Sequence, residues 1–127
     1  MPRESWDSVR VIFLDGEKAI AKLRELAAKV VQENPAVQRV LLFGSLARGD
    51  YSPRSDADLI VVLADDSRRM MDRIPEFLEA FSTAPVPVDV LPYTEAELDK
   101  MLEDDNFFVK RALREALVLA SRQETID

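Results

Sequence analysis

Two aspartates separated by one alanine, Asp56 and Asp58, stand where a polar loop enters the apolar run Leu59–Leu63. The run has the composition of a β-strand. Alternate side chains of a strand point to one face, so the two carboxylates should lie together with Cα atoms roughly 6.5 Å apart. Carboxylates that close raise each other's pKa unless a cation lies between them. Mg²⁺ fits such a pair, because it prefers one or two carboxylates plus phosphate oxygens to an all-protein cage.

The other border of the same loop carries Gly44 and Ser45, directly after the β-type run Val40–Phe43. Glycine lets the backbone approach a ligand closely, and Ser45 adds a hydroxyl. If residues 45–48 form a helical turn, its free N–H groups offer an anion site. Residues 40–63 are therefore predicted to form a strand, a loop and a second strand. Phosphate would be held at Gly44 and Ser45, and the metal would be held opposite them at Asp56 and Asp58.

A third carboxylate, Asp89, lies between two valines in the short β-type segment Val88–Leu91. A carboxylate in an apolar run is costly if it points inward without a partner. Two placements follow: exposure to solvent on an edge strand, or delivery to the face of Asp56 and Asp58 from a neighbouring strand. Three converging carboxylates repel one another without metal, which makes them a good site for two Mg²⁺ ions.

The elements that position these residues follow from periodicity and turn signals. Strands are expected over residues 38–43, 57–63 and 88–91; prolines 85 and 87 place the last one at a sheet edge or at a strand start. The segment Val9–Leu14 fits a short strand, an extended arm or an added helical turn, and its sequence does not distinguish them. We expect residues 121–127 to fray.

Four helices are predicted from apolar spacing and capping residues. The first is capped by Asp15 and ends at Asn34-Pro35. The second covers residues 68–81 after an N-cap region at 64–67, with Pro75 either kinking it or splitting it at Arg73-Ile74. The third opens with a capping box at 94–97 and reaches about Leu102, and the last covers residues 107–119.

Composition bounds the classes of protein that remain. A chain of 127 residues with 47 % apolar and 32 % charged residues is typical of one globular domain. It contains no histidine and no cysteine, which excludes histidine-based nucleophilic catalysis, thiolate metal sites and disulfides. The net charge of −7 argues against direct nucleic-acid binding and would suit a basic protein partner. No apolar stretch has the length of a membrane span, and the N-terminus lacks the apolar core of a signal peptide, so we expect a cytoplasmic protein.

In the segment GSLARGDYSPRSDADLIVVL, ten residues separate Gly44-Ser45 from Asp56-Ala57-Asp58. It resembles the signature of the DNA polymerase β-like nucleotidyltransferase superfamily. In particular it is similar to the minimal nucleotidyltransferase proteins of prokaryotes, which include antitoxins paired with HEPN-domain toxins. That family carries a third acidic residue in a similar PVDV setting, matched here by Asp89. The resemblance covers residues from about Ala19 to Ala120.

The resemblance implies an α/β fold of the nucleotidyltransferase type, with a small mixed sheet of about three or four strands and helices packed on it. We expect a single domain over residues 1–127, with 1–14 an N-terminal arm or an extra strand. The implied reaction is attack by a hydroxyl on the α-phosphorus of ATP or another nucleoside triphosphate. Asp56, Asp58 and Asp89 would be the catalytic residues and the ligands of two Mg²⁺ ions, and Asp89 could also accept the hydroxyl proton.

The phosphates would be held at the other border of the loop. Ser45 and the amides after Gly44 would bind the β- and γ-phosphates. Arg48 is either a further phosphate contact or a surface arginine that pairs with Asp50. Arg54 is a weaker candidate for a phosphate contact than Arg48, and we expect Ser55 to orient Asp56 or the loop.

The acceptor is the open part of this function. Larger relatives carry an additional domain for the acceptor, so we expect a partner protein, a second copy, or a protein substrate to supply it here. In the minimal nucleotidyltransferase antitoxins the acceptor is a toxin tyrosine that becomes adenylylated, and this is the leading hypothesis. The alternatives are an antitoxin that neutralises a HEPN-type toxin by occlusion without turnover, and a small-molecule nucleotidyltransferase.

Overall fold

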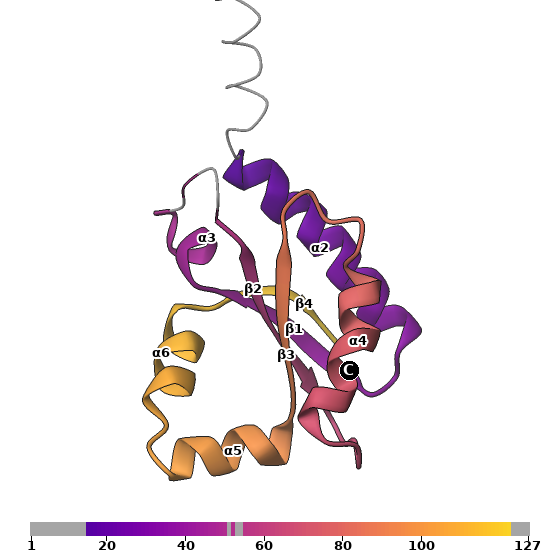
Figure 1. Cartoon of the computed structure of the whole chain (residues 1–127), viewed down its shortest axis with the longest axis vertical. Helices are drawn as coiled ribbons and strands as arrows, with labels where there is room; N and C mark the ends of the chain where they lie inside the picture. The colour runs from indigo at the N-terminus through magenta and orange to yellow at the C-terminus, as the bar shows by residue number, and fades with distance from the viewer. Residues whose placement is uncertain (1–14, 51, 53–54, 123–127) are drawn as a thin grey trace, which may run out of the picture.

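A four-stranded mixed sheet forms the centre of the molecule in the computed structural model, which describes residues 15–50, 52 and 55–122. The strand order is β3-β2-β1-β4 (Figure 1). Strand β1 is antiparallel to both β2 and β4, whereas β2 and β3 are parallel. The predicted α/β fold with a small mixed sheet is therefore confirmed. The strands are β1 Val37–Phe43, β2 Ala57–Leu63, β3 Val88–Thr94 and β4 Leu117–Ser121.

Helices cover both faces of this sheet, with α2 and α4 on one side and α5 and α6 on the other (Figure 1). The two faces are set by the alternation of side chains along β2. Leu59 and Val61 pack under α2 and α4, whereas Ile60 and Val62 pack under α5 and α6. The helices are α2 Gly16–Glu33, α3 Ser45–Arg48, α4 Met70–Ala80, α5 Glu95–Glu103 and α6 Phe107–Glu115.

Local signals fix most helix ends as the sequence predicts. The Asp15 carboxylate accepts a hydrogen bond from the Lys18 N–H at 3.1 Å, and α2 ends at Asn34. Thr94 and Glu97 form the predicted capping box at the start of α5. Asn106 caps α6 through a 3.0 Å bond from the Val109 N–H. In the described part of the chain, no helix has the length and apolarity that a membrane crossing needs.

Helix α4 departs from the prediction in three ways. It begins at Met70 after Arg69, which makes no side-chain capping bond, so the expected N-cap at 64–67 is wrong. It continues through Pro75 instead of splitting there. The carbonyl that Pro75 leaves without a donor belongs to Met71, in the first turn on an exposed side of the helix. Met71 and Leu78 are apolar residues of this helix but are exposed, and Arg73 is buried instead.

The predicted helix over 107–119 is two elements. Helix α6 ends at Glu115, and residues 117–121 form β4 on the edge of β1. The LVLAS sequence pairs with the open edge of β1, so long-range strand pairing overrides the local helical pattern. The predicted frayed tail at 121–127 is wrong at its start, because Ser121 belongs to β4 and Arg122 donates to the carbonyls of Val31, Val37 and Asn34. Residues 123–127 and the Val9–Leu14 segment lie outside the described residues.

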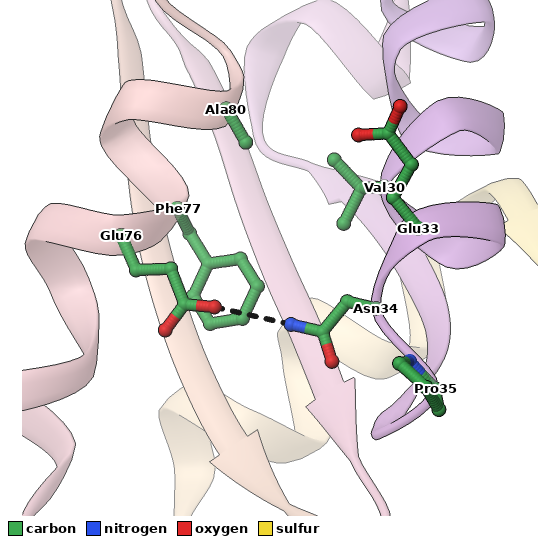
Figure 2. A pocket seen from close by; sticks show the side chains of 7 residues that line it. All are labelled: Val30, Glu33, Asn34, Pro35, Glu76, Phe77 and Ala80. Atoms are coloured by element: carbon green, nitrogen blue, oxygen red, sulfur yellow. Dashed lines mark hydrogen bonds between the residues drawn. The ribbon is translucent and has the colours of Figure 1, made fainter.

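A hollow of about 370 Å³ lies between the end of α2 and helix α4. Figure 2 shows the Asn34 side chain of the turn after α2 reaching across it to the Glu76 carboxylate of α4, with a hydrogen bond of 3.1 Å. Val30 and Phe77, two residues of the hydrophobic core, also line the hollow. It therefore lies on the α2/α4 face of the sheet.

A buried guanidinium ties α4 to the ends of β2 and β3. The Arg73 side chain is 2 % exposed and donates to the carbonyls of Asp66, Arg68 and Pro92. It also donates to both carboxylate oxygens of Glu97, at 2.7 and 2.9 Å. Hydrogen bonding to Glu97 raises the pKa of Arg73, which therefore stays charged. We call these five residues the Arg73 cluster.

Acid is expected to weaken this cluster. Hydrogen bonds from Arg68 lower the pKa of Asp66 to about 2, and the bond from Arg73 lowers the pKa of Glu97. Depressed pKa values in the folded chain mean that ionisation favours folding. This contribution is complete above the unfolded pKa near 4 and disappears as the pH falls toward 2. We expect a loss on the order of 1 kcal/mol in that window, measured by urea unfolding at a series of pH values.

A matched pair of variants isolates this effect. Asp66→Asn should flatten the acid limb of the stability profile, whereas Asp65→Asn, an exposed neighbour, should leave it unchanged. Equal profiles for the two variants would contradict the assignment to Asp66.

Candidate active site

Asp58 and Asp89 are register partners on the parallel strands β2 and β3. The pairing starts with a 2.8 Å bond from the Ala57 N–H to the Pro87 carbonyl, which aligns the two strand starts. Both aspartates alternate with residues of the α2/α4 core and therefore lie on the α5/α6 face. Helices α5 and α6 cover the part of that face around Ile60, so Asp89 stays exposed and Asp58 is half-buried.

The electrostatics place Asp56 in the same group. Burial raises the pKa of Asp58, and the negative charges of Asp89 and Asp56 raise it further. The positive charge of Arg48 acts in the opposite direction. Asp56 itself is exposed, directly before β2. The structure thus brings all three predicted aspartates to one end of one sheet face, and it combines both placements weighed for Asp89: an exposed edge strand beside Asp58.

Gly44 is in contact with this group of carboxylates. It follows β1, whose last residue, Phe43, pairs with Asp58. Its φ is +81°, and a Cβ at this position would lie 2.5 Å from Asp58 Oδ2. The close approach that the sequence predicted at Gly44 is thus made to a carboxylate of the site, and a side chain would displace that carboxylate.

The predicted helical turn is present as α3, Ser45–Arg48, anchored by the buried Leu46. The Ser45 hydroxyl donates to Ser55 Oγ at 3.2 Å, and Ser55 Oγ also accepts from the Ser52 N–H at 2.8 Å. Ser55 thereby orders the loop that carries Asp56, as predicted for it. Arg54 lies outside the described residues.

Arg48 is held by two carboxylates. Its Nε donates to Asp50 at 3.2 Å, which is the surface pairing weighed from the sequence, and its Nη1 donates to Glu115 at 2.9 Å. Glu115 also accepts the Gly44 N–H at 2.9 Å. Sequence reasoning missed Glu115, because it lies 71 residues from Gly44 and no local pattern distinguishes it from other surface glutamates.

A hollow of about 260 Å³ opens beside this loop. Phe43 and Phe108 meet edge to face in its lining, with ring centroids 5.6 Å apart. Phe108 is 53 % exposed although it is a large apolar residue. The lining joins β1, α3 and α6 and comprises Phe43, Gly44, Arg48, Phe108, Arg111, Ala112 and Glu115.

The chemistry of the aspartates fits a divalent cation shared with a phosphate ligand. Within residues 15–50, 52 and 55–122, no three acidic side chains stand close enough together to hold an ion by themselves. Mg²⁺ requires no such cage, since one or two carboxylates with phosphate oxygens and water complete its shell. The pKa of Asp58 is raised by burial and then by the negative charges of Asp89 and Asp56, and a cation would relieve this repulsion.

Comparison with known families decides what this arrangement belongs to. The family described as the nucleotidyltransferase domain matches residues 23–119. The chain belongs to this family. The matched residues include Gly44, Ser45, Asp56, Asp58 and Asp89, so the nucleotidyltransferase domain contains the whole candidate site. No curated protein matches the chain in sequence.

Solved structures agree with the nucleotidyltransferase fold. A candidate nucleotidyltransferase from Sulfolobus solfataricus is 23 % identical with a TM-score of 0.54, covering 87 % of this chain and 91 % of that one. A chain of a toxin–antitoxin crystallised with AMP-PNP is 20 % identical with a TM-score of 0.51, covering 87 % of this chain and 77 % of that one. At these identities the similarity establishes the fold alone.

The two glycines of the motif allow a matched test of the Gly44 contact. Gly49 has a φ of +85° like Gly44, but a Cβ there would meet open space. Gly49→Ala should lose about 1 kcal/mol, because Gly49 is in the left-handed α region, and Gly44→Ala should lose more, because its ψ of −162° lies in a region that is almost restricted to glycine. Only Gly44→Ala should also shift the Asp58 carboxylate and weaken binding of Mg²⁺ with a nonhydrolysable ATP analogue, by tenfold or more. Calorimetric titration of both variants measures this, and equal binding would contradict the contact.

Proposed function

We propose that this protein is a Mg²⁺-dependent nucleotidyltransferase that moves AMP from ATP to a hydroxyl group of a partner protein. The observation that carries the proposal is the register pairing of Asp58 with Asp89, beside Asp56, at the sheet end that Gly44 approaches. Family membership supports the transfer of a nucleotidyl group. ATP is the preferred donor in this proposal because a structural relative was crystallised with AMP-PNP.

The reaction forms a bond between the acceptor oxygen and the α-phosphorus and breaks the bond from the α-phosphorus to the bridging oxygen of the β-phosphate. Pyrophosphate leaves, and the acceptor hydroxyl loses its proton. In this proposal Asp89 accepts that proton, which is supported by its exposure on the edge strand beside Asp58. Ser45 and the amides after Gly44 bind the β- and γ-phosphates, and Arg48 adds a charge-assisted contact once it exchanges Asp50 for phosphate.

Asp56, Asp58 and Asp89 are the residues that would hold Mg²⁺. Bound Mg²⁺ would neutralise charge on the phosphate oxygens and on the leaving pyrophosphate. The carboxylates fix where that cation would lie, at the end of the sheet where Asp58 pairs with Asp89, and the triphosphate would follow the cation to this place. Without a cation their negative charges would repel the triphosphate, which agrees with a metal-dependent site.

The acceptor in this proposal is a tyrosine of a HEPN-type toxin, with this chain as its antitoxin. The support is the structural similarity to a toxin–antitoxin chain and the net charge of −7, which suits a basic partner. A protein acceptor also agrees with the exposure of Asp56 and Asp89, since a macromolecule needs an open approach to the reacting atoms.

The deciding experiment follows label from α-labelled ATP, with Mg²⁺, into proteins that co-purify with this chain. Label on a partner protein, lost when γ-labelled ATP replaces it, would establish transfer of the nucleotidyl group and identify the acceptor. Mapping the label to a tyrosine tests the finer proposal. A stable partner complex that takes no label from any nucleotide would contradict the enzymatic proposal and leave neutralisation by occlusion.

A further inference from the structure

One carboxylate of α6 holds both ends of α3. Glu115 Oε2 accepts the Gly44 N–H at 2.9 Å and Arg48 Nη1 at 2.9 Å, so the residue before α3 and its last residue share one acceptor atom. Both donors belong to the segment 44–48, and the acceptor, Glu115, comes from a distant part of the chain. The Glu115 side chain is 18 % exposed, which strengthens bonds to a charged acceptor relative to a fully solvated pair.

The position of Glu115 is fixed by the core. Val109 and Ala112, on the same helix, are buried against Leu41, Phe43 and Ile60 on the α5/α6 face of the sheet. Beyond Glu115 the chain enters β4, whose residue Leu117 pairs with Leu42 of β1. The backbone of Glu115 is therefore fixed by the packing of α6 before it and by the pairing of β4 after it, and its carboxylate can fix the position of α3.

The contact continues from Glu115 to the reacting centre. The Gly44 peptide that donates to Glu115 belongs to the residue whose Cα lies against the Asp58 carboxylate. A rotation of that peptide would move Gly44 toward or away from Asp58. Arg48, the second donor, carries a positive charge that acts on the Asp58 carboxylate. Both groups that border Asp58 from the α3 side thus depend on Glu115 for their placement.

We propose that Glu115 is a positioning residue for nucleotide binding, which holds the Gly44 peptide and Arg48 in the arrangement that receives the triphosphate. This inference rests on the proposed function. It assigns Glu115 no contact with the substrate. Its effect passes through the two motif residues that it binds, and it makes α6 part of the active site although no residue of α6 reacts.

A role for Glu115 as a competitor of the nucleotide would predict the opposite change in nucleotide affinity when Glu115 is removed. A carboxylate that accepts from an amide and a guanidinium also resembles a phosphate group, so Glu115 could instead compete with the triphosphate for its donors. A positioning residue weakens nucleotide binding when it is removed, whereas a competitor strengthens it. The buried attachment of α6 favours positioning, because a competing group must leave when the ligand arrives.

The experiment compares Glu115→Ala, Glu115→Gln and, as a control for charge, Glu103→Ala on the exposed end of α5. The chain contains three glycines, so glycine-selective ¹⁵N labelling gives three amide signals, from Gly16, Gly44 and Gly49. Hydrogen exchange of the Gly44 amide reports the bond to Glu115 directly, without nucleotide. Calorimetric titration with AMP-PNP and Mg²⁺ reports binding without requiring the acceptor.

For Glu115→Ala we expect exchange at Gly44 to accelerate about tenfold or more and AMP-PNP affinity to fall about tenfold or more. Glu115→Gln keeps an acceptor oxygen but loses the charge that holds Arg48, so both effects should be smaller. Glu103→Ala should match the wild type. Unchanged or tighter AMP-PNP binding in Glu115→Ala would overturn the positioning role alone. Wild-type protein that binds no Mg²⁺-nucleotide would overturn the proposed function and this inference with it.

Discussion

Asp58→Asn is expected to reduce nucleotidyl transfer by on the order of a thousandfold while the folded protein remains intact. The carboxylate of Asp58 lies between Gly44 and its register partner Asp89, so its removal takes one negative charge from the centre of the proposed metal site. Asparagine has the same shape and keeps the contact with Gly44. The fold should therefore survive, and the loss should be confined to metal and nucleotide binding and to the chemical step.

Stability should respond in the opposite direction to activity. Burial and the charges of Asp89 and Asp56 raise the pKa of Asp58, so its ionised form is unfavourable in the folded, metal-free protein. Asp58→Asn removes this repulsion, and thermal unfolding in the presence of a chelator should show equal or greater stability. Added Mg²⁺ should stabilise the wild type more than the variant, because only the wild type has a full set of ligands.

Asp65→Asn is the matched control for this prediction. Asp65 is exposed beyond the opposite end of β2 and carries the same charge. It should retain full transfer and show the wild-type response to Mg²⁺. A fully active Asp58→Asn protein would contradict the assignment of the site. An Asp58→Asn protein that still neutralises a toxin partner, but transfers no label, would separate chemistry from neutralisation by occlusion.

The strand–loop–strand motif could be predicted from sequence because its signals are local. The run before Gly44 and the run after Asp58 are both apolar and β-type, and turn residues separate them. The structure gives β1 as Val37–Phe43 and β2 as Ala57–Leu63, within one residue of prediction. Capping at Asp15 and Thr94 was predictable for the same reason, since a cap requires only residues within one turn.

Other features depend on contacts between distant parts of the chain. The segment after Glu115 continues the helical spacing of α6, yet it pairs with β1 because that strand would otherwise leave an open edge. The contact between Glu115 and Gly44 spans 71 residues and follows from this change of direction. Arg73 stands at helical spacing from Met70 and Phe77, which places it on the buried face, but its partners come from three other segments.

Arg73→Met is expected to cost about 3 to 5 kcal/mol of unfolding free energy. Methionine matches much of the volume of arginine but donates no hydrogen bond. The Pro92 carbonyl would lose its donor in a buried environment, and the Asp66 carbonyl and the Glu97 carboxylate would lose theirs in a partly buried one. Leaving such groups without partners is costly, because they are removed from water without compensation. Urea unfolding, with the midpoint and slope compared to wild type, measures the loss.

Two further variants distinguish the buried network from a simple loss of charge. Arg69→Met removes an arginine from the start of the same helix, but the Arg69 side chain is 87 % exposed, so this variant should lose less than about 1 kcal/mol. Arg73→Met combined with Glu97→Gln should lose less than the sum of the single changes, since the two substitutions remove the same ion pair. Equal losses for Arg73→Met and Arg69→Met would contradict a structural role for the Arg73 cluster.

The cluster contacts the ends of β2 and β3 that lie opposite to Asp58 and Asp89, so Arg73→Met protein that remains folded should bind Mg²⁺-nucleotide with wild-type affinity.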